Sequence, residues 1–337
     1  MSIFNLVVER RKTRSFKWDM MEQIYSIDDA SDILPMWVAD MDFAAPKEVI
    51  EAIEKRLQQQ VLGYSFVDED CKNAIASWHE TRQGWTIKTE TILFHQGVVP
   101  AIATIIETFT EVGDKVAMMS PVYPPFFNVP TNQKREVLFA ELDEHDGIYT
   151  INFERIEQTF KDGAKILILC NPHNPAGIVW SRSDLEKIVS LAINYNVILL
   201  SDEIHADLVL EGNKHIPLFN VQNADKAKII ATIAPTKTFN LAGIQAAMMV
   251  VPCPELRAQL EQNALAHGQM GLNVFASVAV QAAYTFGADW LDELLNYLSM
   301  NMDYVAQELT ALEGIKVRKP GGTYLMWIDY RGTGLSE

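Results

Sequence analysis

The chain has 337 residues, of which 48% are apolar and 21% charged, an ordinary composition for a soluble globular protein with a sizeable core. Its 44 acidic and 28 basic residues give a net charge of −16, which argues against nucleic acid or anionic membrane as a partner, because both select clustered Lys and Arg. No apolar run is long enough for a spanning helix, no secretory signal is evident, and no Cys/His spacing suggests a metal.

Three widely spaced cysteines, Cys71, Cys170 and Cys253, are typical of reduced thiols, so we expect a cytoplasmic protein. The first 45 residues show no regular rhythm of strands and helices. Within them "PMWVADMDF" predicts an extended loop, which a proline-started helix follows from about Ala45.

From about residue 90 onward, short apolar runs alternate with amphipathic stretches. The runs are "TILFHQG" (91–97), "KVAMMS" (115–120), "EVLFAEL" (136–142), "KILILC" (165–170), "NVILLS" (196–201), "KIIATIA" (228–234) and "QAAMMVV" (245–251). Continuous apolar runs of this length are typical of strands buried on both faces. Segment 181–195 has a helical apolar stripe, with Ser181 or Ser183 as the cap. The pattern predicts an α/β fold with a mostly parallel, doubly wound sheet.

After about residue 285 the chain is helical, and "GIKVRKPGGTYLMWIDY" (314–330) then has strand character. We therefore expect a large domain at 46–285. A smaller α+β domain would combine the N-terminal segment 1–45 with residues 286–337.

Unusual residues follow four of the predicted strands at their carboxyl ends, where ligands bind in sheets of this class. They are the turn "NPHNPAG" (171–177), the acidic "DEIH" (202–205), "PTKTFNLAG" (235–243) and the glycine-opened helix after "TILFHQG". Singly, each has an ordinary structural explanation. Asp202 is a plausible helix cap, and Lys237 alone is more often a solvated surface amine. Four such features at four strand ends favour one common site.

Together they suit pyridoxal 5'-phosphate. Lys237 offers an amine for the cofactor aldehyde, and Asp202 an acid that keeps the pyridine nitrogen protonated. Asn174 can donate a hydrogen bond to the phenolic oxygen. The phosphate would bind backbone N–H groups at a helix N-terminus, those of Gly97, Val98 and Val99.

On these residues the sequence resembles the fold-type I pyridoxal-phosphate enzymes of the class I/II aminotransferase superfamily, and within them the MalY/PatB branch of carbon–sulfur β-lyases. The resemblance spans essentially the whole chain. It rests on "RRKTRSFKWD" (10–19), "MWVADMDF" (36–43), "LGYS" (62–65), "HQGVVPAI" (95–102), "PVYPPF" (121–126), "NPHNPAG", "SDEIHADL" (201–208), "APTKTFNLAG" (234–243) and "GGTYLMWIDY" (321–330).

The resemblance implies that Lys237 is the Schiff-base lysine and that Tyr123 stacks on the cofactor ring, with Thr236 a further phosphate contact. It also implies that Tyr64 reaches the phosphate of a neighbouring subunit, and hence a homodimer with active sites at the interface. From the residues alone, Tyr123 can equally be a core aromatic beside prolines, and Tyr64 an exposed loop residue.

The sequence departs from the superfamily pattern in three places near the expected site. His205 stands where many transaminases carry Tyr, which favours a lyase and adds His205 to the cofactor-binding residues, although a structural histidine is an equal alternative. Ala234 and Gln245 replace a serine and an arginine that commonly hold the phosphate. The family also continues past Glu337 to an arginine that binds the substrate carboxylate, so we expect a truncated sequence or an incomplete small domain.

The implied reaction is α,β-elimination from cystathionine or another L-cysteine S-conjugate, giving a thiol, pyruvate and ammonia, with Lys237 as the general base. An aminotransferase shares the first steps and remains the alternative. Some proteins of this branch bind a transcription factor, so a regulatory protein partner is a second alternative.

Overall fold

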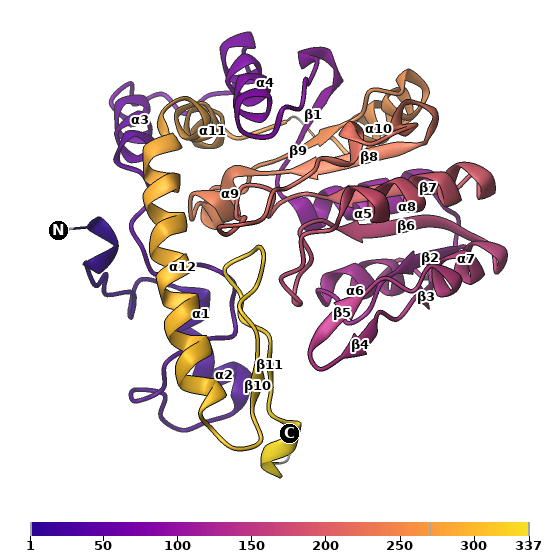
Figure 1. The fold of residues 1–337 in the computed structure, drawn as a ribbon. Coiled ribbons are helices and arrows are strands. Elements are labelled where there is room, and N and C mark those ends of the chain that lie inside the picture. Colours follow the sequence, from indigo (N-terminus) through magenta and orange to yellow (C-terminus); the bar gives the residue numbers. More distant parts are fainter. Residues whose placement is uncertain (1, 270, 336–337) are drawn as a thin grey trace.

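A seven-stranded sheet of order β1-β9-β8-β7-β6-β2-β3 forms the centre of the computed structural model, which describes residues 2–269 and 271–335 (Figure 1). The strands are β1 (Ile92–His95), β2 (Lys115–Met118), β3 (Glu136–Phe139), β6 (Ala164–Cys170), β7 (Ile198–Asp202), β8 (Ile229–Ile233) and β9 (Ala247–Val250). Strands β3, β2, β6, β7 and β8 pair in parallel, whereas β9 is antiparallel to both β8 and β1. The predicted, mostly parallel sheet is confirmed, and each of the seven apolar runs forms one strand.

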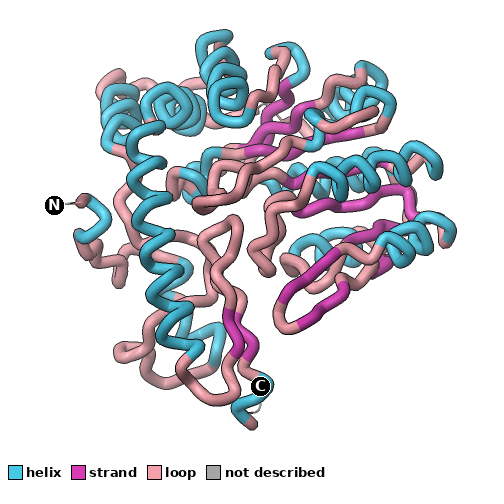
Figure 2. The backbone as a smooth tube through the Cα atoms, viewed as in Figure 1, coloured by secondary structure: helices cyan, strands magenta, loops and turns pink. Residues whose placement is uncertain are grey.

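Apolar side chains emerge from both faces of the central strands. Along β2, for example, Val116 and Met118 pack into one core cluster, while Ala117 packs into another on the opposite face. Helices α5 (Val98–Phe109), α6 (Pro125–Asn132) and α10 (Pro254–Ala266) belong to the first cluster, and α7 (Phe153–Lys161) and α8 (Arg182–Tyr195) to the second. Figure 2 shows the strands enclosed by these helices. Burial on both faces explains why the strands read as continuous apolar runs.

Helix α8 shows how local sequence fixes the strand that follows it. The Ser181 hydroxyl accepts a hydrogen bond from the N–H of Asp184 and forms a capping box with that residue, so Ser181 and not Ser183 is the cap. The helix ends at Asn196, whose φ of 55° is left-handed. That turn directs the chain into β7, which has Asp202 as its last residue.

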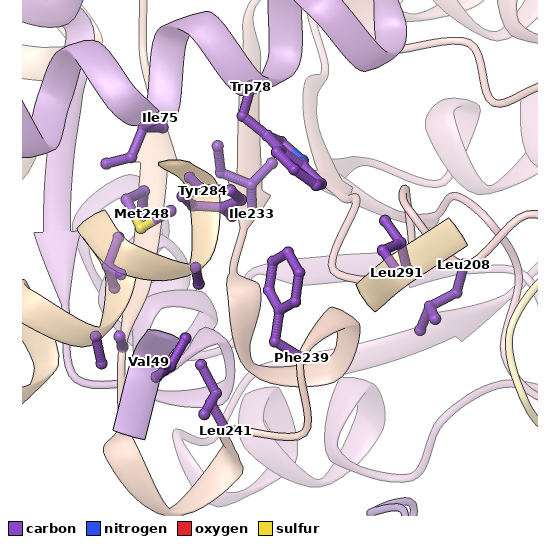
Figure 3. Packing of buried hydrophobic residues seen from close by; sticks show 14 of the residues in the cluster. Val49, Ile75, Trp78, Leu208, Ile233, Phe239, Leu241, Met248, Tyr284 and Leu291 are labelled. Carbon is purple, nitrogen blue, oxygen red and sulfur yellow. The ribbon is translucent and has the colours of Figure 1, made fainter. Parts of the chain in front are cut away.

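A third cluster packs around Phe239, directly after the short helix α9 (Pro235–Thr238) that carries Lys237. Phe239 is fully buried, and its ring meets those of Trp78 at 5.4 Å and Tyr284 at 6.2 Å (Figure 3). Helices α3 (Lys47–Leu57), α4 (Glu69–Gln83) and α11 (Val274–Phe286) contribute side chains to this third cluster. This aromatic packing anchors the α9 loop against the core.

The N-terminal segment and the β10–β11 segment both run beside the long helix α12 (Ala288–Thr310), although the two termini themselves lie apart (Figure 1). The N-terminal part has helices α1 (Phe16–Asp19) and α2 (Met21–Tyr25), and Phe4 before them packs on Trp290 and Tyr297 of α12. We propose on this basis the domain division expected above, with 1–45 and 286–337 in the smaller unit and 46–285 in the larger.

Three details differ from the sequence expectations. The first long helix, α3, begins at Lys47 after Pro46, two residues later than predicted. Of segment 314–330, only β10 (Lys316–Val317) and β11 (Ile328–Asp329) are strands. A hairpin of β4 (Asp143–His145) and β5 (Ile148–Thr150) was not predicted. No helix in the described residues has the length and apolar character needed to cross a membrane.

Candidate active site

A cavity of about 200 Å³ lies where β6 and β7 end and α5 and α9 begin. It is lined by nine of the ten residues predicted from the sequence, namely Gly97, Val98, Val99, Tyr123, Asn174, Asp202, His205, Thr236 and Lys237. The tenth, Tyr64, does not line it, and its side chain is fully exposed. Residues scattered over 140 positions of the chain therefore meet because the carboxyl ends of neighbouring strands share one edge of the sheet.

Asp202 supplies a buried carboxylate at the floor of this cavity, since only 4% of its surface is exposed. Its Oδ1 accepts hydrogen bonds from the N–H of Ile204 at 3.1 Å and the hydroxyl of Thr232 at 3.2 Å. Burial raises the pKa of Asp202 to about 7, against the smaller opposing effects of these bonds. Neither donor is a cation, so the carboxylate suits a positively charged ring nitrogen as its partner.

Lys237 approaches the cavity from α9, which Pro235 starts directly after β8. Its Nζ donates a hydrogen bond to the main-chain carbonyl of Ala39. Burial lowers the pKa of Lys237, while the carboxylates of Asp40 and Asp202 oppose that shift. The amine is consequently more nucleophilic at neutral pH than a solvated lysine, because a larger fraction is unprotonated.

The carbonyl of Ala39 also accepts a hydrogen bond from the phenol of Tyr324, at 2.8 Å. Sequence reasoning missed both residues as site components. They lie in "MWVADMDF" and "GGTYLMWIDY", two motifs that carried the family resemblance without a residue role being assigned. Every residue carries a main-chain carbonyl, so the residue type at position 39 gives no sign that this carbonyl is an acceptor in the site.

The segment that contains Ala39 is held in place by charge pairs and by one amide. Arg10 binds Asp40 at 2.8 Å and Asp42 at 2.6 Å, and Lys17 binds Asp42 at 2.7 Å. Asn240, three residues after Lys237, hydrogen-bonds the main chain of this segment. The N-terminal segment is thereby fixed to the loop that follows Lys237.

The start of α5 provides a site for an anion. Gly97 is the N-cap and has no side chain to accept bonds from the first turn, so the N–H groups of Val98 and Val99 remain for a ligand. Such a helix N-terminus carries partial positive charge and binds phosphate. Thr236 and Gln245 line the same cavity, although Gln245 brings an amide where many superfamily members have arginine.

The remaining lining residues are neutral. His205 is buried, and burial together with the nearby Lys237 charge lowers its pKa to about 3, so the ring is uncharged. Tyr123 is partly buried and packs edge-to-face on Phe126 with ring centroids 5.8 Å apart. Asn174 follows β6, and its N–H donates to Cys170 Sγ at 3.3 Å, which fixes the main chain of the turn.

These residues fit the cofactor expected from the sequence. A buried carboxylate without a cationic donor, an amine of lowered pKa and a free helix N-terminus match its ring nitrogen, its aldehyde and its phosphate. In the part of the chain that the structure describes, no group of three His, Cys, Asp or Glu side chains is placed to hold a metal ion.

Comparisons with known proteins identify the family. A family model described as aminotransferase class I and II matches residues 31–336. The chain is 43% identical over 332 residues to a protein named cystathionine beta-lyase PatB from Bacillus subtilis, covering 98% of this chain and 85% of the relative.

Two solved structures have nearly the same fold. A PLP-bound putative aminotransferase from Clostridium difficile superposes with a TM-score of 0.94 at 39% identity, over 98% of this chain and 85% of that one. Cystalysin from Treponema denticola, which contains pyridoxal 5'-phosphate, gives a TM-score of 0.94 at 34% identity, over 98% and 84% of the two chains.

Proposed function

Because this chain belongs to the aminotransferase class I and II family, we propose that it is a pyridoxal 5'-phosphate-dependent carbon–sulfur β-lyase acting on cystathionine or a related L-cysteine S-conjugate. The observation that carries the proposal is the meeting of Lys237, Asp202 and Asn174 at one cavity in a chain so similar to a cystathionine beta-lyase. The same similarity favours the lyase over the aminotransferase alternative.

The residues around the cavity divide the work of holding the cofactor. Lys237 would bond its aldehyde carbon, and Asp202 would pair with its protonated ring nitrogen. Asn174 would donate to its phenolic oxygen, and Tyr123 would pack against its ring. The phosphate binds the N-terminus of α5, with the hydroxyl of Thr236 as an additional donor.

When bound, pyridoxal 5'-phosphate supplies an electron sink for bond breaking at the α- and β-carbons of an amino acid. Lys237 would then act as the base, because its Nζ lies at this cavity and would accept the Cα proton. Its lowered pKa suits this role, since a larger fraction of the amine is unprotonated than in a solvated lysine. Asp202 remains an acceptor for the ring nitrogen throughout.

A homodimer completes the proposed site. Tyr64 lies in an exposed stretch with Val61, Leu62 and Phe66, whose side chains are mostly accessible to solvent. A run of exposed apolar residues is typical of an interface, and two-fold symmetry would bring each Tyr64 to the other subunit's phosphate. The widely spaced cysteines favour a cytoplasmic location for this dimer.

An assay with L-cystathionine tests the function. We expect pyruvate and a free thiol without any added keto acid. Strict dependence on a keto-acid acceptor would instead identify an aminotransferase. Borohydride reduction should fix the cofactor mass on the peptide that contains Lys237. Lys237→Ala should abolish both results, whereas Lys88→Ala, at an exposed lysine, should change neither.

A further inference from the structure

Tyr324 is joined to Lys237 by a single shared atom. The phenol of Tyr324 and the amine of Lys237 both donate to the carbonyl oxygen of Ala39. Two donors on one oxygen are close neighbours, so the phenol lies beside the group that receives the Cα proton. The cofactor contacts assigned above leave Tyr324 without a role.

The ring of Tyr324 borders the cavity from the smaller domain. It meets the ring of His205 edge-on, with centroids 6.0 Å apart and planes at 79°, and His205 lines the cavity. Burial raises the pKa of Tyr324, so its hydroxyl carries a proton at neutral pH. The phenol is thus a proton donor at the edge of the site.

The main chain around Tyr324 is fixed to the larger domain. The N–H of Thr323 donates to the carbonyl of Leu208 at 2.7 Å, and Thr323 is fully buried. At Gly322 an added Cβ would meet side chains of Pro172 and Val179 at 3.1 Å. This close packing holds the phenol at one position, as a proton-transfer group requires.

We propose that Tyr324 protonates the departing sulfur during β-elimination, an inference that rests on the proposed lyase function. The Cβ–S bond breaks and its electron pair stays on sulfur, which takes the phenolic proton and leaves as a thiol. Lys237, having accepted the Cα proton, returns a proton to the phenolate directly or through one water. The Cα proton thus replaces the one given to sulfur, and the step needs no outside acid.

The acidities suit this transfer. Burial raises the pKa of the Tyr324 phenol above its ordinary value of about 10, and it likewise raises that of the Cys170 thiol, which lines the same cavity, above its ordinary value of about 8.5. Because the same surroundings raise both acids, transfer from the phenol to a thiolate leaving in this cavity stays nearly balanced. A nearly balanced transfer between positioned groups is where general acid catalysis is effective. A leaving group that needs no proton gains nothing from Tyr324.

That difference gives the test. The cofactor-loaded Tyr324→Phe variant is compared with wild type on L-cystathionine, which expels an alkyl thiolate, and on β-chloro-L-alanine, which expels chloride. We expect kcat for cystathionine to fall about 100-fold or more, and kcat for β-chloroalanine to change less than about 3-fold. Tyr297→Phe is the matched control, because Tyr297 packs on Phe43 of the same N-terminal segment and does not line the cavity.

Each other outcome overturns the inference. Equal losses on both substrates would assign Tyr324 a structural role, and no loss on either would leave the protonation to Lys237 alone. A wild-type protein that forms pyruvate from neither substrate would overturn the lyase function as well, which separates the two failures.

A structural measurement supplies a readout independent of turnover. The Lys237→Ala variant, loaded with cofactor and soaked with L-cystathionine, lacks the base and should retain the substrate intact. We expect the substrate sulfur within hydrogen-bonding distance of Tyr324 Oη. A sulfur on the far side of the cavity from Tyr324 would contradict the proposal.

Discussion

The side-chain amide of Asn240 both accepts a hydrogen bond from the main chain of Met41 and donates one to it. Its oxygen accepts from the Met41 N–H at 3.0 Å, and its nitrogen donates to the Met41 carbonyl at 2.8 Å. The same nitrogen donates to the carbonyl of Phe43, also at 2.8 Å. One side chain thereby joins two segments 199 residues apart and holds the Ala39 carbonyl against Lys237.

Removing this amide should destabilise the fold. We expect Asn240→Ala to lower the free energy of unfolding by about 2–3 kcal/mol, because three partly buried hydrogen bonds are lost at about 1 kcal/mol each. Urea unfolding of the cofactor-free protein measures the change. The control is Asn223→Ala, since Asn223 shares the left-handed backbone but, among the described residues, its side chain hydrogen-bonds Lys226 alone. Equal losses in both variants would point to backbone strain instead.

Asp202 should make the stability of the cofactor-free protein fall with rising pH. Its pKa is about 7 when folded against an ordinary 3.8, so between about pH 4 and 7 the folded form holds a proton that the unfolded chain has released. Stability is therefore fully present below this window and is lost as pH rises through it. Because Asp202→Asn cannot ionise, the difference in stability between this variant and wild type should be about 3 kcal/mol larger at pH 8 than at pH 5, in favour of the variant.

Urea titrations at pH 5, 6, 7 and 8 check this expectation. The exposed Asp225→Asn should follow the wild-type curve at every pH. Added cofactor should remove the difference in wild type, because the ring nitrogen then pairs with the carboxylate. A wild-type stability that rises over this range relative to Asp202→Asn would show the sign to be wrong.

The buried carboxylate of Glu203 should be among the most destabilising positions to truncate. It accepts hydrogen bonds from His215 Nε2 at 2.8 Å, from the Ser201 hydroxyl at 2.8 Å and from the Leu218 N–H at 3.0 Å. We expect Glu203→Ala to lower the free energy of unfolding by about 3–5 kcal/mol, because three buried donors lose their acceptor. Glu203→Gln should lose less, as its amide oxygen still accepts.

Urea unfolding again gives the number, with the exposed Glu154→Ala as the control. A loss below about 1 kcal/mol for Glu203→Ala would mean that water replaces the carboxylate at this position.

Mixed dimers test whether Tyr64 serves the neighbouring site. We expect Lys237→Ala and Tyr64→Ala to be inactive or strongly impaired alone. When the two are refolded together, half of the dimers are hybrids with one intact site, so lyase activity should recover to about a quarter of wild type. Absence of recovery in a mixture shown to contain hybrids would place Tyr64 outside the partner's site. Tyr25→Ala, at another exposed tyrosine, is the control. It should keep full lyase activity on its own, so there is no loss for a hybrid dimer to restore.

Much of the fold follows from the sequence because strands buried on both faces carry continuous apolar runs. Because buried strands are apolar whatever their direction, the sequence does not show which of them run antiparallel. "QAAMMVV" forms the antiparallel β9, yet its composition is like that of the parallel strands of the sheet. The β4–β5 hairpin was missed because "DEH" and "IYT" are short, and their residues are largely exposed.

The lining of the cavity was predictable where cofactor chemistry requires a side-chain type, as at Lys237, Asp202 and Asn174, and where a helix begins after a strand, as at Gly97. It was not predictable at Tyr324, whose position depends on the packing of the loop between β10 and β11 against the larger domain. A side chain that reaches the cavity from the other domain leaves no local pattern in the sequence.

The acceptor shared by Lys237 and Tyr324 belongs to the peptide linkage between Ala39 and Asp40, so no exchange of side chain at position 39 deletes it. Conventional mutagenesis of this residue will thus report on bulk and leave the electronic role of the oxygen unseen. Its strength as an acceptor can be lowered chemically by an ester in place of that amide, which also removes the N–H that Asp40 donates to Val38 at 2.9 Å. A scan of the chain by codon changes would accordingly assign any effect at Ala39 to side-chain size, although two proton-carrying groups depend on its carbonyl oxygen.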